Sequence, residues 1–323
     1  MGGLTRVFMK RPDSGAIIGV IVIYGVFAII DQVGWLNSFT QKNIFHFAAI
    51  LGLMAIGQSI VMMAREIDIS VGSVYGLSGI SFIMFEPHVG VPTAVIMALG
   101  LAAVAGLLNA FFVLYLRLPA MIVTLGALFS IRGLIYVVSG GSVSSLDKEG
   151  RDHWLTQAFG GNWFGVENAV LWCLLVTLIL SVVLNQTRFG NHLLAVGGDP
   201  ASARSQGIRV NVVKTIAFVM CSVLAGFSAI LTLADQPQTH VTLGQEQELE
   251  AIAAAVIGGI MLTGGRGTIV GALLGALIIT AVRYELVALG APSSWFITFV
   301  GVVLIASVIF NTYISRKIIT TAH

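Results

Sequence analysis

The chain has 323 residues, of which 57% are hydrophobic and only 10% are charged, whereas a soluble domain carries about 25% charged residues. A chain of this composition cannot cover itself with a wetted surface, so a soluble globular protein is excluded. The formal net charge of +2 is too small to indicate nucleic-acid binding, and the sequence has no basic tract interleaved with aromatic residues.

Apolar runs of roughly 16 to 25 residues recur along the chain, and at about 1.5 Å of rise per residue each can cross a bilayer as a helix. They predict ten spans, at residues 15–30, 48–64, 70–85, 92–116, 120–139, 168–185, 212–234, 249–263, 267–284 and 295–313. Proline disfavours helix interiors, and all 7 prolines fall at or between the proposed ends. The expected fold is an all-α integral membrane protein, with residues 1–323 forming a single transmembrane domain.

Lysine and arginine concentrate in alternate connections, and such residues are enriched on the cytoplasmic side of a membrane. With both termini cytoplasmic, that side holds Arg6, Lys10, Arg11, Arg65, Arg117, Arg188, Arg204, Arg209, Lys214, Arg266, Arg316 and Lys317. The other side then holds Lys42, Lys148, Arg151 and Arg283, together with acidic loops at 140–167 and 235–248. Ten crossings agree with this orientation, because an even number returns the chain to the same side.

A faint repeat links "SVGSVYGLSG" at 70–79 with "IVGALLGALI" at 269–278, since Gly72 and Gly76 align with Gly271 and Gly275. It indicates two weakly repeated halves, although chance similarity in a chain with 37 glycines is the alternative. Small residues four apart let helix backbones approach closely in lipid. Each pair of glycines is therefore a candidate packing seam.

Polar residues inside spans are costly and are candidates for function. Gln58 and Asn109 fall toward the middle of their spans, and Thr124 lies in the next one. Their side chains can donate and accept hydrogen bonds, as a hydroxyl-rich solute requires, so they are predicted to line a solute pathway; hydrogen bonding between helices is the alternative. We expect Asp68 to cap the third span or support the turn before it. For Arg132 we expect snorkelling or pairing with an acid such as Asp147.

No catalytic or metal site is predicted. Cys173 and Cys221 both lie in apolar runs and are expected to be buried thiols, and the 6 histidines lack metal-ligand spacing. No serine–histidine, paired-aspartate or zinc-protease arrangement supports an intramembrane enzyme. Ion-coupled secondary transporters keep carboxylates at midplane sites, whereas the acids of this chain are predicted at the edges of the spans.

The 186–213 connection contains its own short helix signal in "GDPASARSQGI". Asp199 is an N-cap, Pro200 takes the first helical position and Gly207 ends the helix. So short a helix is unstable alone in water. We expect it to dock into a partner or to lie along its own membrane domain.

A second signal precedes the span at 249–263, in "THVTLGQEQELEAIAAA". Thr242 and Gln245 have capping-box spacing, and Glu246, Glu248 and Glu250 fall near a helix start, where carboxylates are favoured. That structural role is sufficient by itself, and a polar mouth facing a partner or a solute is the functional alternative.

The glycines that follow, in "GGIMLTGGRGT" at 258–268, do not form a phosphate-binding loop, because the required lysine is absent. The chain is therefore not expected to bind ATP. Glycine permits tight reversals, so this stretch is predicted to turn at the cytoplasmic edge, which Arg266 marks.

Four motifs in order carry a resemblance to a known family. They are "EIDISVGSVYGLSG" (66–79), "GLAAVAGLLNAFFVLYLRLPAMIVTLGALFSIRG" (100–133), "TRFGNHLLAVGGDPASARSQGIRVNVVK" (187–214) and "ELEAIAAAVIGGIMLTGGRGTIVGALLGALII" (248–279). The chain resembles the permease subunits of bacterial ABC sugar importers of the ribose, xylose and galactose group. It departs from the family pattern at Glu66, usually glycine, and at Asp199 and Pro200, usually asparagine and glutamate.

This resemblance implies a non-enzymatic subunit of the inner membrane, usually paired with a second copy, that translocates a monosaccharide. A periplasmic binding protein would deliver the solute, and separate cytoplasmic ATPase subunits would hold ATP and magnesium. The expected coupling residues are Asp199, Pro200, Ala201, Ser202, Ala203, Arg204, Ser205, Gln206 and Gly207, and the expected binding-protein contacts are Glu246, Glu248 and Glu250. Branched-chain amino acids, autoinducers and polyols remain alternative cargo.

Overall fold

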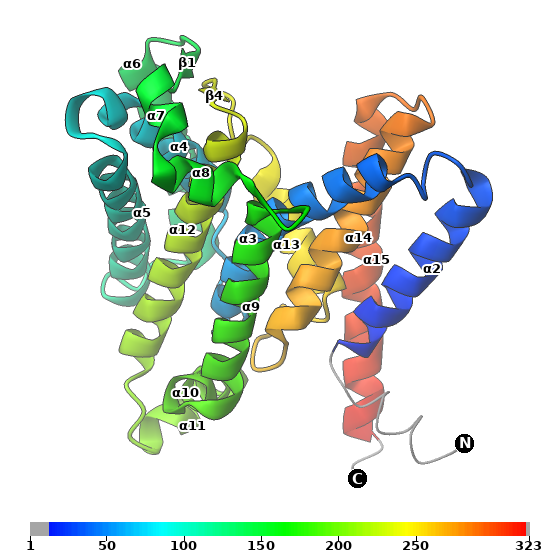
Figure 1. The fold of residues 1–323 in the computed structure, drawn as a ribbon. Coiled ribbons are helices and arrows are strands. Elements are labelled where there is room, and N and C mark those ends of the chain that lie inside the picture. Colours follow the sequence, from blue (N-terminus) through cyan, green and yellow to red (C-terminus); the bar gives the residue numbers. More distant parts are fainter. Residues whose placement is uncertain (1–12, 321–323) are drawn as a thin grey trace.

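The computed structural model describes residues 13–320 of the chain. Helices dominate the fold (Figure 1). In chain order the helices are α2 (Ser14–Ile30), α3 (Ser38–Met63), α4 (Val71–Val89), α5 (Val91–Leu114), α6 (Ala120–Ser139), α7 (Lys148–Asp152), α8 (Trp154–Gly160), α9 (Asn168–Gln186), α10 (Arg188–Gly198), α11 (Pro200–Ser205), α12 (Val210–Asp235), α13 (Gln247–Ile257), α14 (Ile269–Ala288) and α15 (Ser293–Thr320). Strand β1 (Ser144–Ser145) pairs antiparallel with β4 (Gln238–Thr239), and β2 (Asn162–Trp163) pairs with β3 (Val166–Glu167).

Each predicted span falls on a helix, and six helices of residues 13–320 are long and apolar enough to cross a membrane: α3, α5, α6, α9, α12 and α14. The predicted span 249–263 needs correction. Helix α13 has 11 residues, which rise about 17 Å, roughly half of a hydrocarbon core of about 30 Å. An irregular turn at 258–268 follows it, because Gly259, Gly264 and Gly265 adopt positive φ.

Two other boundaries differ from the prediction. Helix α3 begins ten residues early, at Ser38, where the Asn37 side chain accepts a hydrogen bond from the Phe39 amide at 2.9 Å. The polar residues of its first turns dilute the apolar signal there. Helix α4 continues to Val89 and contains Pro87 in its last turn, since a proline so close to a helix end disturbs little of the hydrogen-bond ladder.

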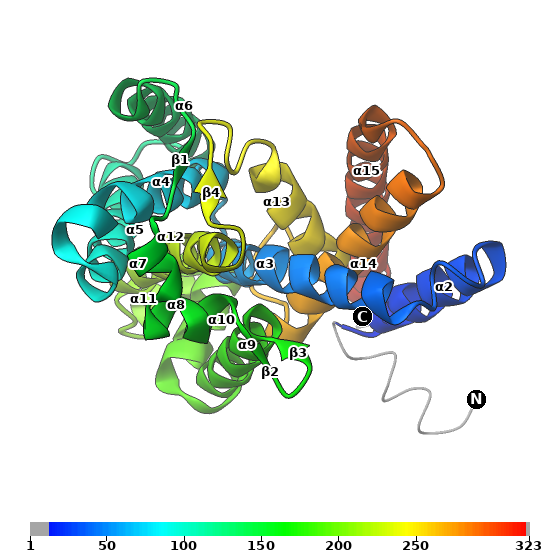
Figure 2. The same cartoon turned by 45° about the horizontal axis from the view of Figure 1, so that its top comes forward.

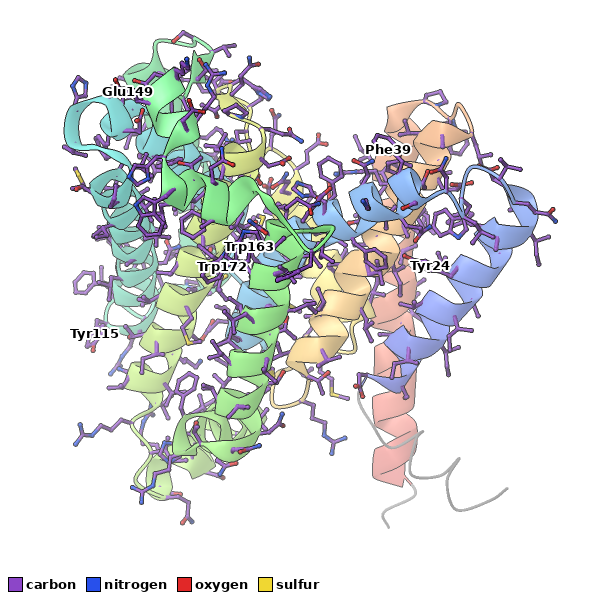
Figure 3. All side chains as sticks on the ribbon, in the orientation of Figure 1. Tyr24, Phe39, Tyr115, Glu149, Trp163 and Trp172 are labelled. Atoms are coloured by element: carbon purple, nitrogen blue, oxygen red, sulfur yellow. The ribbon has the colours of Figure 1, made fainter. Side chains whose placement is uncertain are left out.

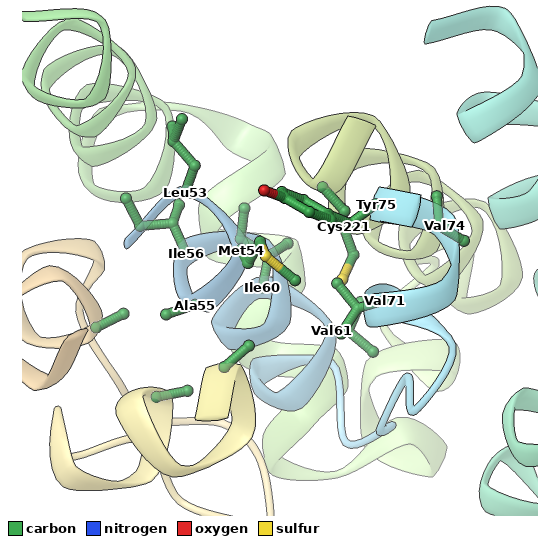
Figure 4. Close-up of a cluster of buried hydrophobic side chains, with 14 of the residues drawn as sticks. Leu53, Met54, Ala55, Ile56, Ile60, Val61, Val71, Val74, Tyr75 and Cys221 are labelled. Carbon is green, nitrogen blue, oxygen red and sulfur yellow. The ribbon is translucent and has the colours of Figure 1, made fainter. Parts of the chain in front are cut away.

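The core is built around α3, which is buried along most of its length and packs against α9, α12, α13 and α14. Figure 4 shows this centre, where Met54 and Ile60 of α3 face Tyr75 of α4 and Cys221 of α12. The peripheral helices α6 and α9 instead leave most of their apolar side chains partly or fully exposed. An apolar exterior around a packed interior is what a lipid environment requires.

The molecule has two distinct ends (Figures 1 and 2). One, the α8 end, carries α7, α8 and the β1–β4 pair; the opposite one, the α11 end, carries α10 and α11. Figure 3 shows Glu149 at the α8 end and Tyr115 projecting from the lower part of α5, toward the α11 end. The first turn of α2 and the last turn of α15 lie at the α11 end. The two termini themselves, which were predicted to be cytoplasmic, belong to residues 1–12 and 321–323 and lie outside the described residues.

Both predicted glycine seams are places of close backbone approach. A Cβ at Gly76 of α4 would lie 2.5 Å from the Leu243 carbonyl, and one at Gly72 would lie 2.6 Å from the Gly244 carbonyl. On α14, Cβ atoms at Gly271 and Gly275 would overlap carbonyls of Gly258 and Ala254. Close contacts with α4 on one side and α14 on the other therefore hold α13 and the residues next to it, 243–258, in place.

Candidate transport site

A non-helical segment, residues 64–70, joins α3 to α4, with Arg65 exposed and the Asp68 and Ser70 side chains inside the protein. Asp68 and Ser70 are both 0% exposed. The Asp68 carboxylate accepts hydrogen bonds from the Ser70 amide at 2.9 Å and the Ser70 hydroxyl at 2.6 Å. The expectation that Asp68 supports this turn is confirmed. Asp68 and Ser70 have no contact with water, so this part of the segment depends on its neighbours for hydrogen bonds.

The three predicted pathway residues converge on this segment. Asn109 donates to the Ser70 hydroxyl at 2.8 Å, and Thr124 donates to the Ala120 carbonyl at 2.9 Å and the Ile67 carbonyl at 3.4 Å. With its amide oriented to satisfy both partners, Gln58 donates to the Asp68 carbonyl at 3.0 Å and accepts from the Asp68 amide at 3.3 Å. All three side chains are at most 2% exposed. In this conformation they hold segment 64–70, and the lining of a pathway stays a prediction.

The suggested pairing of Arg132 with Asp147 is wrong. Arg132 donates to the Leu243 carbonyl at 2.6 Å, and thereby ties α6 to the loop before α13. Asp147 caps α7 by accepting from the Gly150 amide at 2.7 Å. Each group thus satisfies a backbone partner close to it.

At the α11 end, the short helix forms where its cap signals predict it. The Asp199 carboxylate accepts from the Ala201 amide at 3.0 Å and the Ser202 hydroxyl at 2.6 Å. The helix ends with Gly207 at φ +83°, where amides 207 and 208 donate to carbonyls 204 and 203, the hydrogen-bond pattern of a Schellman motif. Of residues 201–207 only Ala203 is buried, so α11 presents most of its surface outward.

The Asp199 cap gives the first testable expectation. Hydrogen bonds from the Ser202 hydroxyl and the Ala201 amide hold the pKa of this carboxyl below its ordinary value. The cap is therefore fully present above the ordinary pKa of aspartate and is lost only as the pH falls through the lowered one. Asp199→Ala should accelerate hydrogen–deuterium exchange across 200–205 at neutral pH. Asp199→Asn, which still caps, should not; equal protection in both variants would contradict this.

A basic groove of about 1080 Å³ opens beside α11. Its polar lining includes Arg117, Arg204, Arg209 and Lys214, with Glu66 as the acidic member. Lys214, at the start of α12, pairs with Glu66 at 2.5 Å, which connects segment 64–70 to the corner that carries α11. Four of the cations assigned to one side from sequence thus line this groove at the α11 end.

The end of α3 is a second contact point of this corner. The Met63 carbonyl accepts from the Gly265 amide at 3.0 Å, and a Cβ at Gly197 of α10 would overlap the same carbonyl. The predicted glycine turn therefore lies directly against α10 and the end of α3, and Arg266 is exposed there. A movement of α10 and α11 would therefore be transmitted by direct contact to α3 and to the α13–α14 turn.

At the other end, the predicted capping box before α13 is wrong. Thr242 lies in an irregular turn, where its carbonyl accepts from the Gln245 amide, and α13 begins only at Gln247, after Glu246 in a left-handed conformation without a side-chain cap. Glu246 is exposed, Glu248 is partly buried and Glu250 is buried. Of the three glutamates, Glu246 is thus the one with an exposed side chain.

Sequence reasoning missed two charged clusters, because their members are far apart in the chain. Glu250 of α13 forms an ion pair with Arg283 of α14. His46 of α3 lies against Glu167, and its Nε2 is 3.6 Å from a carboxylate oxygen of Asp235. Asp68 and Glu285 are buried as well, although each lies beside the end of a predicted span. No sequence pattern links positions this distant.

The remaining side chains offer little reactive chemistry. Cys173 and Cys221 are buried free thiols, as expected. Among residues 13–320, no three His, Cys, Asp or Glu side chains are arranged to hold a metal ion. What the geometry provides is a packed helical scaffold, a short exposed helix at one end and polar groups between helices, an arrangement suited to moving a solute.

Comparisons with known proteins agree with this. A family model described as "Branched-chain amino acid transport system / permease component" matches residues 40–308. The autoinducer 2 import system permease protein LsrC of Photorhabdus luminescens is 32% identical over 311 residues, covering 95% of this chain and 92% of that protein. The proteins of the same name from Yersinia pseudotuberculosis serotype O:1b (strain IP 31758) and Yersinia pestis (strain Pestoides F) are each 34% identical over 309 residues, covering 95% of this chain and 87% of theirs.

No solved structure matches the chain. The family match covers most of the sequence and includes segment 64–70, α10, α11 and the α13–α14 turn. The chain therefore belongs to the branched-chain amino acid transport system permease family, as a multi-pass permease subunit of an ABC importer in the inner membrane.

Proposed function

We propose that this subunit imports a small polar solute of monosaccharide size, and that ATP hydrolysis in separate partner chains drives the transport. The observation that supports this best is α11, an exposed capped helix whose corner packs on both α3 and the α13–α14 turn. ATP and magnesium would bind the partner ATPase and not this chain. Residues 1–323 would act as one permease domain, usually with a second copy beside it.

In this proposal the α11 end faces the cytoplasm and docks on the ATPase through Asp199, Pro200, Ala201, Ser202, Ala203, Arg204, Ser205, Gln206 and Gly207. The groove next to α11 is rich in arginine, so it complements an acidic surface on the ATPase. Movement there would reach α3 through Gly197 and would reach segment 64–70 through the Lys214–Glu66 pair.

Replacing Arg204 by glutamate tests the docking. If the reversal costs about 1.4 kcal/mol of association, binding weakens about tenfold, and solute-stimulated ATP hydrolysis and uptake should fall together. Lys148→Glu is the control for association with the ATPase, because Lys148 is also exposed but lies on α7 at the α8 end. Undiminished coupling in Arg204→Glu, with no crosslinks from cysteines at Ser202 and Ser205 to the ATPase, would reject α11 as the docking helix.

The α8 end would face the periplasm and receive the binding protein. We propose that the segment at 240–250 takes part in this contact. Glu246 is exposed and would touch the binding protein directly, whereas Glu248 and Glu250 are more buried and would support the segment from inside the protein. Exposed charges are screened over about 10 Å at 0.1 M salt. A contact made by Glu246 should therefore weaken as the salt concentration rises.

Two classes of solute are candidates for transport. A monosaccharide follows from the motifs at 66–79 and 187–214, whereas autoinducer 2 is favoured by the names of relatives that cover 95% of this chain. Thermal-shift measurements on the binding protein of the same system, with D-ribose, D-xylose, D-galactose and autoinducer 2, separate the two. Stabilisation by none of these would reject both classes.

A further inference from the structure

A cavity of about 440 Å³ lies between α3, α13 and α14 in the half of the molecule toward the α8 end. This volume falls in the range of about 300–1,000 Å³ that is typical of small-molecule sites. At about 30 Å³ per molecule it would hold roughly fifteen waters. Its wall consists of Phe47, Ile50 and Leu51 of α3, Gln247 and Glu250 of α13, and Thr280, Arg283, Tyr284, Val287 and Ala288 of α14.

One wall of this cavity carries an ion pair. The Glu250 side chain is only 7% exposed and accepts from the Arg283 guanidinium, whose side chain is 44% exposed and whose Cζ lies 4.1 Å from the ring centre of Phe296 on α15. A buried carboxylate among membrane helices is costly without a partner, and the half-exposed Arg283 supplies one for Glu250. The pair places a charged donor and a charged acceptor at the wall of the cavity.

The Gln247 side chain is a second polar group of the wall. Its oxygen is buried and accepts no hydrogen bond in the described part of the chain. The side chain also lies within hydrogen-bonding reach of the Tyr75 hydroxyl on α4. The hydroxyls of Thr280 and Tyr284 belong to the same wall, so both donors and acceptors are available.

The helix that supplies Gln247 and Glu250 is well held. Helix α13 spans half a membrane, follows an irregular loop, and is packed by the glycines of α4 and α14 from two sides; Figure 2 shows it between α3 and α15. Interrupted helices of this kind place polar groups at solute sites in transporters. Gln58, Asn109 and Thr124, in contrast, use their hydrogen bonds on segment 64–70.

We infer that this cavity is a binding site for the solute during its passage, and that its occupant is an uncharged molecule with several hydroxyl groups. Glu250 and Arg283 would bind hydroxyls as acceptor and donor, the Thr280 and Tyr284 hydroxyls would donate and accept, and Phe47 would cover the less polar face. The inference rests on the proposed function. A lipid acyl chain is disfavoured as the occupant, because it offers no hydrogen-bonding group to the ion pair or to the Thr280 and Tyr284 hydroxyls.

Cysteine accessibility tests this in the complete assembly, reconstituted with its ATPase and binding protein. The two native cysteines are 1% and 0% exposed, so background labelling is low. Thr280→Cys and Gln247→Cys place thiols in the wall, and Gln236→Cys supplies an exposed control outside it. Each is treated with a small hydrophilic methanethiosulfonate, alone and with D-ribose, D-xylose, D-galactose or autoinducer 2, while uptake of each probe is measured in parallel.

We expect both wall cysteines to react and a transported probe to slow them about tenfold at about ten times its dissociation constant, since an occupied site cannot react. The control should be unaffected. If a probe is taken up but protects neither position, the cavity is not the solute site, although the proposed function stands. Labelling only by a lipid-soluble maleimide would assign the cavity to lipid. If no probe is taken up, the proposed solute class fails and the inference fails with it.

Discussion

Gly275→Ala is expected to prevent α13 and α14 from packing and to remove most of the folded protein. A Cβ at this position would overlap the Ala254 carbonyl oxygen and would lie 2.8 Å from the carbonyl carbon and 3.0 Å from the Gly258 amide nitrogen. Backbone atoms cannot rotate away as a flexible side chain can. Overpacking in a well-packed core costs about 1–3 kcal/mol, and separation of two helices exceeds that range because the whole seam opens.

The measurement is the yield of monodisperse protein in detergent and its thermal unfolding temperature. Gly126→Ala is the matched control, because Gly126 lies in α6 with nothing within 4 Å of the added methyl group, and alanine is the better helix former. A Gly275→Ala protein that unfolds at the same temperature as the Gly126→Ala protein would refute the seam.

Asn109→Leu is expected to destabilise the protein through segment 64–70. The substitution removes the donor to the Ser70 hydroxyl at 2.8 Å and a weaker one to the Asp68 carboxylate at 3.5 Å. An unsatisfied buried polar group costs about 1–3 kcal/mol, and more when the group is charged. The thermal unfolding temperature in detergent should therefore fall clearly, whether or not transport is also affected.

Asn185→Leu is the control for this substitution, because the Asn185 amide is exposed and bonds only within its own helix, to the Ser181 carbonyl. Surface changes of that kind stay within about 0.5 kcal/mol. If Asn109→Leu unfolds like the wild type but loses uptake, the amide lines the pathway and the structural role assigned to it is wrong.

Local signals predicted the elements that depend on neighbouring residues. Asp199, Pro200 and Gly207 determine α11 through hydrogen bonds within a few residues, so their sequence order is sufficient. The glycine turn at 258–268 is similar, because positive φ at Gly264 and Gly265 is a property of glycine itself. Apolar runs likewise placed every span on a helix.

Features that depend on distant partners could not be predicted. Helix α13 packs against α3, α14 and the glycines of α4, and its length depends on these contacts. The apolar pattern of residues 249–263 does not show where the helix ends. The partners of Gln58 and Asn109 lie on a segment whose burial is known only after α4, α5 and α12 assemble. Glu250 and Arg283 are 33 residues apart, so their pairing appears only in the folded chain.

The most direct test of the central claim is uptake into proteoliposomes that contain this subunit, its ATPase and its binding protein. The account predicts accumulation of D-ribose or autoinducer 2 that requires all components and internal access to hydrolysable ATP, and that ends when the ATP is exhausted. Accumulation by this chain alone, driven by a proton or sodium gradient and indifferent to ATP, would contradict it.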